Sequence, residues 1–451
     1  MDKMADVLGR AGAWCGQNKY LSAIKNAFQN FMPLTIAGAI GVLWCNVLVN
    51  ESTGLGIFFK PIMALEFLNP AFQAVNFCTI SCITVGITLG IAQEIGVWNM
   101  GAEKAGYIPG LVGLAAWLSV TNTSHMVEGA KEAFTGIAGN ELGATGLFTG
   151  MIIGVLSVEL FCFFEKQDAL KIKMPEQVPP GVARAFEVLV PATITLIITA
   201  CIGSACYNLT GLYLNDVIKN GIQGPLGAVG ATIPGVMIIY LVIMLFWLVG
   251  IHGNNMLSAV KEALFTPLAL ENVEKFNKGE KPTNIINMYF LQMCGEFGGS
   301  GVTIGLVIAI MIFGKREDNK AIATLSLVPG LFNINETVTF GIPMVLNPIL
   351  GIPFVFACLV TILVGYVLTV IGFCPVACLT VPWTTPPIVF GFLACGANVM
   401  GAVTQAILIV VSTVIYVPFL IAYEKYQNKQ GYVVFLSFIV YKGTMDLEVR
   451  I

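Results

Sequence analysis

Four ionisable side chains stand inside long apolar stretches of this sequence: Glu159, His252, Glu296 and Glu336. On insertion scales a charged side chain at the centre of a membrane helix costs about 2.5–3.5 kcal/mol, so a residue of this kind is a candidate for function. Carboxylates and imidazole can hydrogen-bond a polar ligand there, and they can take up or release a proton.

Glu336 lies in the polar segment NINETVTFG, between Asn335 and Thr337. Amide and hydroxyl neighbours can orient a carboxylate and leave it able to accept hydrogen bonds from a ligand hydroxyl. Alternatively, Glu336 is a structural carboxylate at the start of the following helix, where the helix dipole stabilises its charge. The two roles can coexist, and Asn335 would share the binding role.

His252 is one of two histidines and opens a second polar segment, GIHGNN, at the end of an apolar run. Neutral imidazole both donates and accepts a hydrogen bond, and it titrates near physiological pH. Together with Asn254 and Asn255 it forms a group of polar side chains suited to sugar hydroxyls. The alternative is a histidine that only ties a loop to a neighbouring helix.

Glu296 adjoins small residues that allow close helix packing, and it could pair with His252 or belong to a cavity wall. Trp247 and Trp383 lie beside the polar segments and could stack on a sugar ring, although Trp247 could instead belong to an interfacial belt. Glu159 is close to the end of a span, where we expect it to reach the interface or to pair.

Membrane helices must position these residues. The chain of 451 residues is 56% hydrophobic and 11% charged, whereas soluble domains carry about 25% charged residues. Residues 337–423 include no Asp, Glu, Lys, Arg or His. Because roughly 20 apolar residues cross a bilayer, the sequence predicts an all-α polytopic membrane protein with about ten transmembrane helices. The net charge of −3 gives no indication of nucleic-acid binding.

The distribution of Lys and Arg predicts the orientation of these helices. The positive-inside rule assigns four basic regions to the cytoplasm: 3–25, 166–184, 315–320 and 425–429. Three full spans between 184 and 315 would leave 315–320 outside, so one further half-crossing is needed. Residues 252–270 suit it best, because they are too short and too charged for an ordinary span.

Two more segments are rich in proline and glycine, 325–343 and 374–392, which favours broken helices or hairpins at membrane depth. All three irregular segments fall in the second half of the chain. We therefore predict a scaffold half, a working half and a tail: 1–210 with a cytoplasmic connector near 165–187, 225–424 with re-entrant segments near 252–270 and 325–343, and a cytoplasmic tail at 425–451.

Common enzyme motifs are not found. The sequence has no HExxH, GxSxG or P-loop pattern, and its twelve cysteines show no zinc spacing. We expect no metal and no cofactor. Any phosphoryl donor would have to lie on another chain.

The polar segments resemble those of a known family. GIHGNN (250–255), NINETVTFGIP (333–343) and VPWTTPP (381–387) are similar to the membrane subunit, component IIC, of the bacterial phosphoenolpyruvate-dependent sugar phosphotransferase system, in its lactose/cellobiose/diacetylchitobiose branch. LGATGLF (142–148) and FMPLTIAG (31–38) agree with this. The resemblance covers about residues 1–427, and 431–451 have no recognised counterpart.

This resemblance implies a homodimer in the bacterial plasma membrane, joined through its N-terminal half. The C-terminal half, with two re-entrant hairpins, would bind and carry a β-linked disaccharide of the diacetylchitobiose or cellobiose class. Glu336 would meet the hydroxyl that becomes phosphorylated, with His252 beside it, and Asn255, Trp247 and Trp383 would line the pocket. A separate cytoplasmic IIB component would donate the phosphoryl group from a phosphocysteine.

A proton- or sodium-coupled secondary sugar transporter is the main alternative. In that case Glu336 and His252 would relay protons, and broken helices near the membrane midplane suit such a transporter equally well. A purely structural or signalling membrane protein would leave the polar clusters unexplained.

Overall fold

The computed structural model describes residues 17–51, 59–125, 134–175, 177–342 and 347–448, together with the isolated residues 10, 14, 56 and 344. Beyond residue 428 it describes the backbone alone. Pro343, the last residue of one predicted re-entrant segment, lies outside the described residues. So do 1–9 of the predicted scaffold half and 449–451 of the predicted tail.

Where the structure describes the first half of the chain, its regular elements are helices and one short hairpin, in which Ser124 pairs with Thr135. Its elements are α2 (Lys19–Leu43), η1 (Trp44–Leu48), η3 (Lys60–Leu68), α3 (Asn69–Asn76), η4 (Phe77–Ser81), α4 (Ile83–Met100), α5 (Ala102–Ala105), α6 (Ile108–Val120), β1 (Ser124–His125), β2 (Phe134–Thr135), α7 (Gly139–Leu142), α8 (Ala144–Glu165), η5 (Asp168–Leu170) and α9 (Pro180–Thr210).

In the described part of the second half, all regular secondary structure is helical, and several of the helices are short. Its elements are α10 (Leu214–Ile218), η6 (Lys219–Gln223), α11 (Gly224–Gly230), α12 (Ile233–Leu248), α13 (Gly253–Met256), α14 (Ser258–Asn277), α15 (Met288–Gly295), η7 (Ser300–Val302), α16 (Ile304–Phe313), α17 (Glu317–Leu331), α18 (Glu336–Gly341), α19 (Gly351–Val370), α20 (Val389–Ala394) and α21 (Val399–Glu448).

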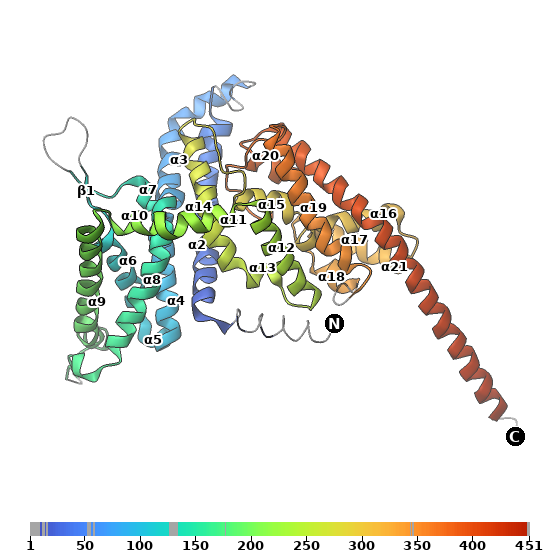
Figure 1. Cartoon of the computed structure of the whole chain (residues 1–451), viewed down its shortest axis with the longest axis horizontal. Coiled ribbons are helices and arrows are strands. Elements are labelled where there is room, and N and C mark those ends of the chain that lie inside the picture. Colours follow the sequence, from blue (N-terminus) through green and yellow to red (C-terminus); the bar gives the residue numbers. More distant parts are fainter. Residues whose placement is uncertain are drawn as a thin grey trace.

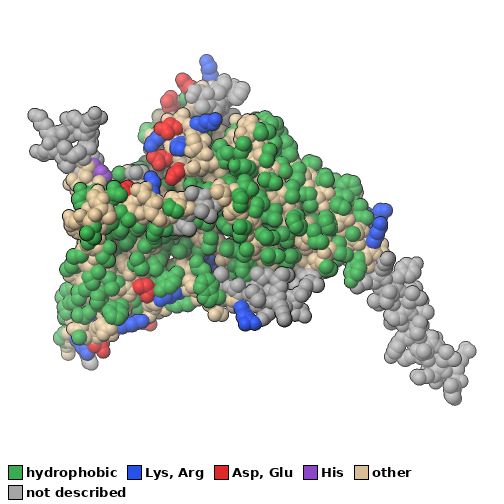
Figure 2. Space-filling view, viewed as in Figure 1, with side chains coloured by type: hydrophobic (Ala, Val, Ile, Leu, Met, Phe, Trp, Pro, Cys, Tyr) green, Lys and Arg blue, Asp and Glu red, His purple; other side chains and the backbone are tan. Residues whose placement is uncertain are grey.

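Within the described residues, five helices are long and apolar enough to cross a membrane: Lys19–Leu48, α8, α9, α19 and Val399–Asn428. Two bent pairs raise the number to seven if each pair is one span, and α6 and α12 are shorter apolar helices. Charged side chains gather at the upper and lower edges of the surface seen in Figure 2, and hydrophobic side chains cover most of the area between them. The predicted all-α membrane fold is confirmed, and the predicted number of about ten spans stays a prediction.

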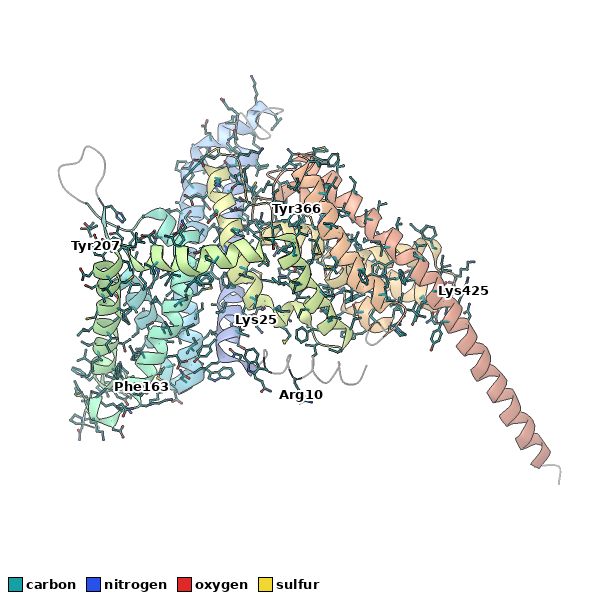
Figure 3. The ribbon with its side chains drawn as sticks, in the orientation of Figure 1. Arg10, Lys25, Phe163, Tyr207, Tyr366 and Lys425 are labelled. Carbon is teal, nitrogen blue, oxygen red and sulfur yellow. The ribbon has the colours of Figure 1, made fainter. Side chains whose placement is uncertain are left out.

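Small residues let the helices of the first half approach closely. A Cβ atom on Gly150 of α8 would lie 2.2 Å from Thr88 Oγ1 of α4, and one on Gly113 of α6 would lie 2.3 Å from Ala92 Cβ of α4. Glycine at these positions therefore brings α6 and α8 onto α4. Figure 3 places Phe163 near the lower end of this bundle and Tyr207 near its upper end, so α8 and α9 run antiparallel.

The two halves lie side by side and meet along α14 (Figure 1). This helix packs against α2 and α8 of the first half as well as α13 and α15 of the second. Asn46 donates a hydrogen bond of 3.2 Å to Asn277 at the end of α14. The segment α10–α11 crosses between the halves in the same view. Residues 252–270 contain α13 and the start of α14, which continues to Asn277, and their role as a half-crossing stays a prediction.

Candidate functional site

His252 and Glu336 come together from two separate breaks in the helical structure. His252 follows α12 and Glu336 is the first residue of α18, yet the imidazole Nε2 lies 3.9 Å from the carboxylate Oε1. The two side chains are 38% and 47% exposed. A ligand hydroxyl at hydrogen-bond distance from both atoms fits this separation. Glu336 is also the first residue of α18, which agrees with the structural role weighed for it, and its role in ligand binding stays a prediction.

The hydrogen bonds of His252 assign its tautomer. The backbone N–H of Asn255 donates to Nδ1 at 3.3 Å, which makes the imidazole the N-cap of α13. Because an amide N–H can only donate, Nδ1 is the accepting nitrogen and the ring proton is on Nε2. Nε2–H therefore faces Glu336. Asn255, predicted to bind sugar, has an exposed side chain and contributes this backbone contact.

Trp247 packs against the imidazole ring of His252. The indole ring of Trp247 lies 4.4 Å from the His252 ring and 6.4 Å from that of Phe354, and it is 3% exposed. Gly250, between Trp247 and His252, has a φ of 81°, which turns the chain back at the end of α12. A ring buried in this way does not lie in an interfacial belt, and the role of Trp247 in a sugar pocket stays a prediction.

A glycine-rich break, residues 296–303, receives side chains from both polar segments. Asn254 Nδ2 donates to Ser300 Oγ at 3.0 Å, and Asn335 Nδ2 donates to the Ser300 carbonyl oxygen at 2.8 Å. Among the described residues, Asn254 Oδ1 is buried and has no hydrogen-bond partner. The apolar stretch is bent at this break, with an angle of 59° between Met288–Val302 and Ile304–Phe313.

Asn333 joins the third irregular segment to the same break. Its amide donates to the carbonyl oxygens of Trp383 (2.5 Å) and Thr385 (3.1 Å), and its Oδ1 accepts from the N–H of Gly298 at 2.6 Å. The Trp383 side chain is 45% exposed. Asn333 was not among the predicted site residues. Its φ of 63° is a conformation that asparagine tolerates better than most residues, and the doubled asparagine in NIN was the available signal.

Glu296 has partners other than His252. It forms an ion pair with Lys261 of α14, and the Tyr240 hydroxyl donates a hydrogen bond of 2.7 Å to Oε1. Both charged side chains are largely buried, so each needs the other's charge. The predicted pairing of Glu296 with His252 is wrong, because the carboxylate pairs with Lys261 instead. Lys261 was missed, although a lysine within the predicted half-crossing was a visible signal.

Glu159 behaves as expected. Its carboxylate lies 2.6 Å from Lys19 Nζ and accepts from Asn99 at 3.4 Å. The predicted pairing at the end of the span is confirmed. It removes Glu159 from the candidates for ligand binding.

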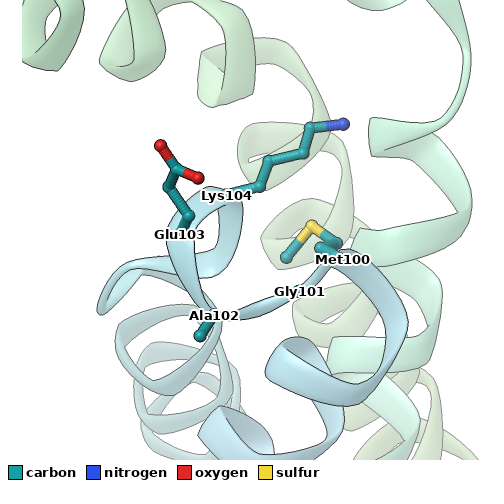
Figure 4. Close-up of a pocket in the computed structure, with 5 residues that line it drawn as sticks. All are labelled: Met100, Gly101, Ala102, Glu103 and Lys104. Carbon is teal, nitrogen blue, oxygen red and sulfur yellow. The ribbon is translucent and has the colours of Figure 1, made fainter.

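A surface recess of about 460 Å³ lies in the first half, at the junction of α4 and α5 (Figure 4). It is lined by Met100–Lys104, and the Lys104 ammonium pairs with Glu165 at 2.8 Å. None of the predicted site residues borders it. Over the described part of the chain, no group of three or more His, Cys, Asp or Glu side chains is placed to hold a metal ion.

Comparison with known proteins gives consistent similarities. A family model described as "Phosphotransferase system, EIIC" matches residues 25–358. The oligo-beta-mannoside-specific EIIC component of Bacillus subtilis (strain 168) is 33% identical, over 94% of each chain. The cellobiose-specific EIIC component of Lactococcus lactis subsp. lactis (strain IL1403) is 29% identical, over 95% of this chain and 98% of that one.

A solved structure is similar along nearly the whole fold. The transporter ChbC, the IIC component from the N,N'-diacetylchitobiose-specific phosphotransferase system, superposes with a TM-score of 0.84 at 29% identity. The match covers 93% of this chain and 96% of that one.

Proposed function

Because this chain belongs to the EIIC family of the phosphotransferase system, we propose that it carries a β-linked disaccharide inward and presents one hydroxyl to a separate IIB component for phosphorylation. It is a multi-pass protein of the bacterial plasma membrane and a sugar-specific component of the cellobiose, lactose and chitobiose type. The names of the relatives support a sugar of the diacetylchitobiose or cellobiose class.

The pairing of His252 with Glu336 is the observation that carries this proposal. Nε2–H of the imidazole can donate to a sugar hydroxyl oxygen while the Glu336 carboxylate accepts the hydroxyl proton. In phosphoryl transfer the hydroxyl oxygen bonds to phosphorus, the bond from phosphorus to the donor thiolate breaks, and Glu336 takes the proton. Most of the acceleration comes from positioning and from charge stabilisation. Once Glu336 passes this proton to water, its carboxylate and the sugar phosphate are both negative and repel each other, which favours release into the cytoplasm.

The other predicted site residues would act in different ways. Asn255 has an exposed amide, Asn254 and Asn335 are held by Ser300, and Trp383 presents a half-exposed ring on which a pyranose can stack. Trp247 would hold the imidazole in position by packing against it. Glu296, paired with Lys261, would form part of the cavity wall.

We further infer that residues 1–210 form the contact of a homodimer and that 225–424 move against them during transport. The two segments α13–α14 and α17–α18 would be the re-entrant hairpins. The first is packed against helices of both halves, as irregular backbone at membrane depth requires, whereas the second leaves Leu325, Val328 and Phe340 exposed. Exposed apolar side chains of α9, such as Ile197 and Ile202, would then face lipid or the second copy. Cross-linking between cysteines introduced in the first half tests the dimer.

Glu336→Gln tests the role of the carboxylate. The amide keeps the size of the side chain but cannot take the hydroxyl proton, so phosphorylation of a bound sugar should fall by at least about 100-fold, as expected for the loss of a general base. The assay is sugar phosphate formation with phospho-IIB. Glu66→Gln, at an exposed site on η3, is the matched control and should retain activity. Full activity of Glu336→Gln would refute the proposed role.

A proton- or sodium-coupled transporter is not favoured, because the relatives that share nearly the whole chain are named as phosphotransferase-system components. Purified protein in liposomes separates the two functions. We expect sugar phosphate to form only when phospho-IIB is supplied. Sugar accumulation driven by a proton or sodium gradient alone would contradict the proposal.

A further inference from the structure

Both polar segments are hydrogen-bonded to one residue, Ser300, in the break between α15 and α16. We propose that Ser300 is a positioning residue of the sugar site: its hydroxyl fixes the amide of Asn254 and its carbonyl oxygen fixes Asn335. The inference rests on the proposed function, since it concerns the same sugar site.

Ser300 reaches both members of the central pair through their chain neighbours. Asn254, two residues beyond His252, donates to Ser300 Oγ at 3.0 Å. Asn335, the residue before Glu336, donates to the Ser300 carbonyl oxygen at 2.8 Å. One residue, itself 4% exposed, thus sets how the two segments are placed relative to each other.

The loop around Ser300 cannot shift easily. A Cβ atom on Gly299 would lie 2.6 Å from the Asn335 side chain, and one on Gly301 would lie 2.5 Å from the Phe354 ring. Both glycines have positive φ, and the Tyr416 hydroxyl donates to the Gly301 carbonyl oxygen at 2.8 Å. Packing from three sides makes the loop a fixed frame for the site.

The contact with Ser300 leaves one polar atom of Asn254 without a partner. With Nδ2 bound to the Ser300 hydroxyl, the carbonyl Oδ1 is buried and unpartnered within the described structure. A buried acceptor without a partner is unfavourable, and a ligand O–H or N–H would satisfy it. In this orientation Asn254 suits a sugar that offers a hydrogen-bond donor at this position, either a hydroxyl or an acetamido N–H.

Direct binding of a disaccharide to the purified protein tests this chain of contacts. Cellobiose and diacetylchitobiose serve as probes in titration calorimetry. In Ser300→Ala the amide of Asn254 can turn, so the affinity should fall by about 10-fold, corresponding to the loss of one oriented hydrogen bond. Ser326→Ala is the matched control, because this serine is 1% exposed and its hydroxyl bonds to a carbonyl within its own helix, that of Ile322.

A double-mutant cycle separates positioning from a general structural effect. If Ser300 acts through Asn254, the variants Ser300→Ala, Asn254→Leu and the double variant should bind with similar affinity, so the two losses do not add. Ser300→Cys keeps the volume of the side chain but offers a weak acceptor, and it should bind with intermediate affinity even if Ser300→Ala folds poorly. A deoxy sugar that lacks the donor should bind wild type and Ser300→Ala alike.

Additive losses in the cycle, or wild-type affinity in both Ser300 variants, would overturn the inference. Its failure differs from failure of the proposed function. If wild type binds disaccharide but yields no sugar phosphate with phospho-IIB, the phosphotransfer role fails and the cycle still decides the role of Ser300. If wild type binds neither probe, both proposals are overturned.

Discussion

Lys261→Met would remove the cation that neutralises Glu296 inside the second half. Lys261 is 6% exposed, and the carboxylate that it leaves behind would keep one contact, the hydroxyl of Tyr240 at 2.7 Å. Breaking a buried ion pair by removing one partner costs about 3–5 kcal/mol, because the remaining charge is uncompensated. The Glu296 side chain is 18% exposed, so water screens part of this charge, and we expect a loss near the lower figure.

The double variant Lys261→Met/Glu296→Gln removes both charges and leaves an amide that can still accept from Tyr240. It should therefore recover most of the stability that Lys261→Met loses, since replacing both members of a buried pair is often close to neutral. Lys278→Met is the control: this lysine is 58% exposed and pairs with Glu274 one turn away. Such a pair contributes about 0.3–0.5 kcal/mol.

Thermal unfolding in detergent, followed by tryptophan fluorescence, measures the four proteins under one condition. The expected order of stability is wild type and Lys278→Met together, then the double variant, then Lys261→Met. If Lys261→Met unfolded together with Lys278→Met, the pair would not be the buried contact described. A double variant no more stable than Lys261→Met would show that the packing of the lysine stem, rather than its charge, dominates.

Two further predictions concern the scaffold and the cytoplasmic edge. Gly150→Leu should destabilise the first half by at least about 2 kcal/mol, because its side chain would overlap Thr88 of α4, whereas a leucine at an exposed site such as Gly181 should not; equal melting temperatures would contradict the close packing. Hydrogen bonds from Arg316 at 3.0 and 2.6 Å hold the pKa of the Asp318 carboxyl below its ordinary value. The stability that this carboxyl contributes is complete above the pKa of an unfolded aspartate, about 3.9, and is lost only as the pH falls through the lower pKa of the folded protein. Asp318→Asn and wild type should therefore show the same pH dependence of stability from about pH 5 to 8.

The chemistry of the site could be predicted because apolar surroundings make polar residues conspicuous. His252 and Glu336 are 84 positions apart in the sequence, and both stand out as polar interruptions of apolar stretches. The family resemblance implied that the two side chains lie beside each other, and the imidazole Nε2 and the carboxylate Oε1 lie 3.9 Å apart. Their role in sugar binding stays a prediction.

The partners of Glu296 could not be predicted in the same way. Which cation reaches a buried carboxylate depends on the angle at which α14 passes α15, and no periodicity in the sequence encodes that angle. The glycines of 298–301 were interpreted as small residues for helix packing. Their positive φ values, which break the span and carry Ser300 into the site, depend on contacts with Asn335 and Phe354 that are distant in the sequence.

The position of α14 constrains how this protein can move. The helix begins six residues after His252, while its far end is hydrogen-bonded to Asn46 and packs on α2 and α8. His252 and Glu336 are joined through Asn254, Ser300 and Asn335, so α14 belongs to the same unit as the site. If the two halves moved against each other, the contacts of α14 with α2, α8 and Asn46 would have to change while the pair stayed together. The surface between α14 and the first half is therefore the place where such a movement would be seen.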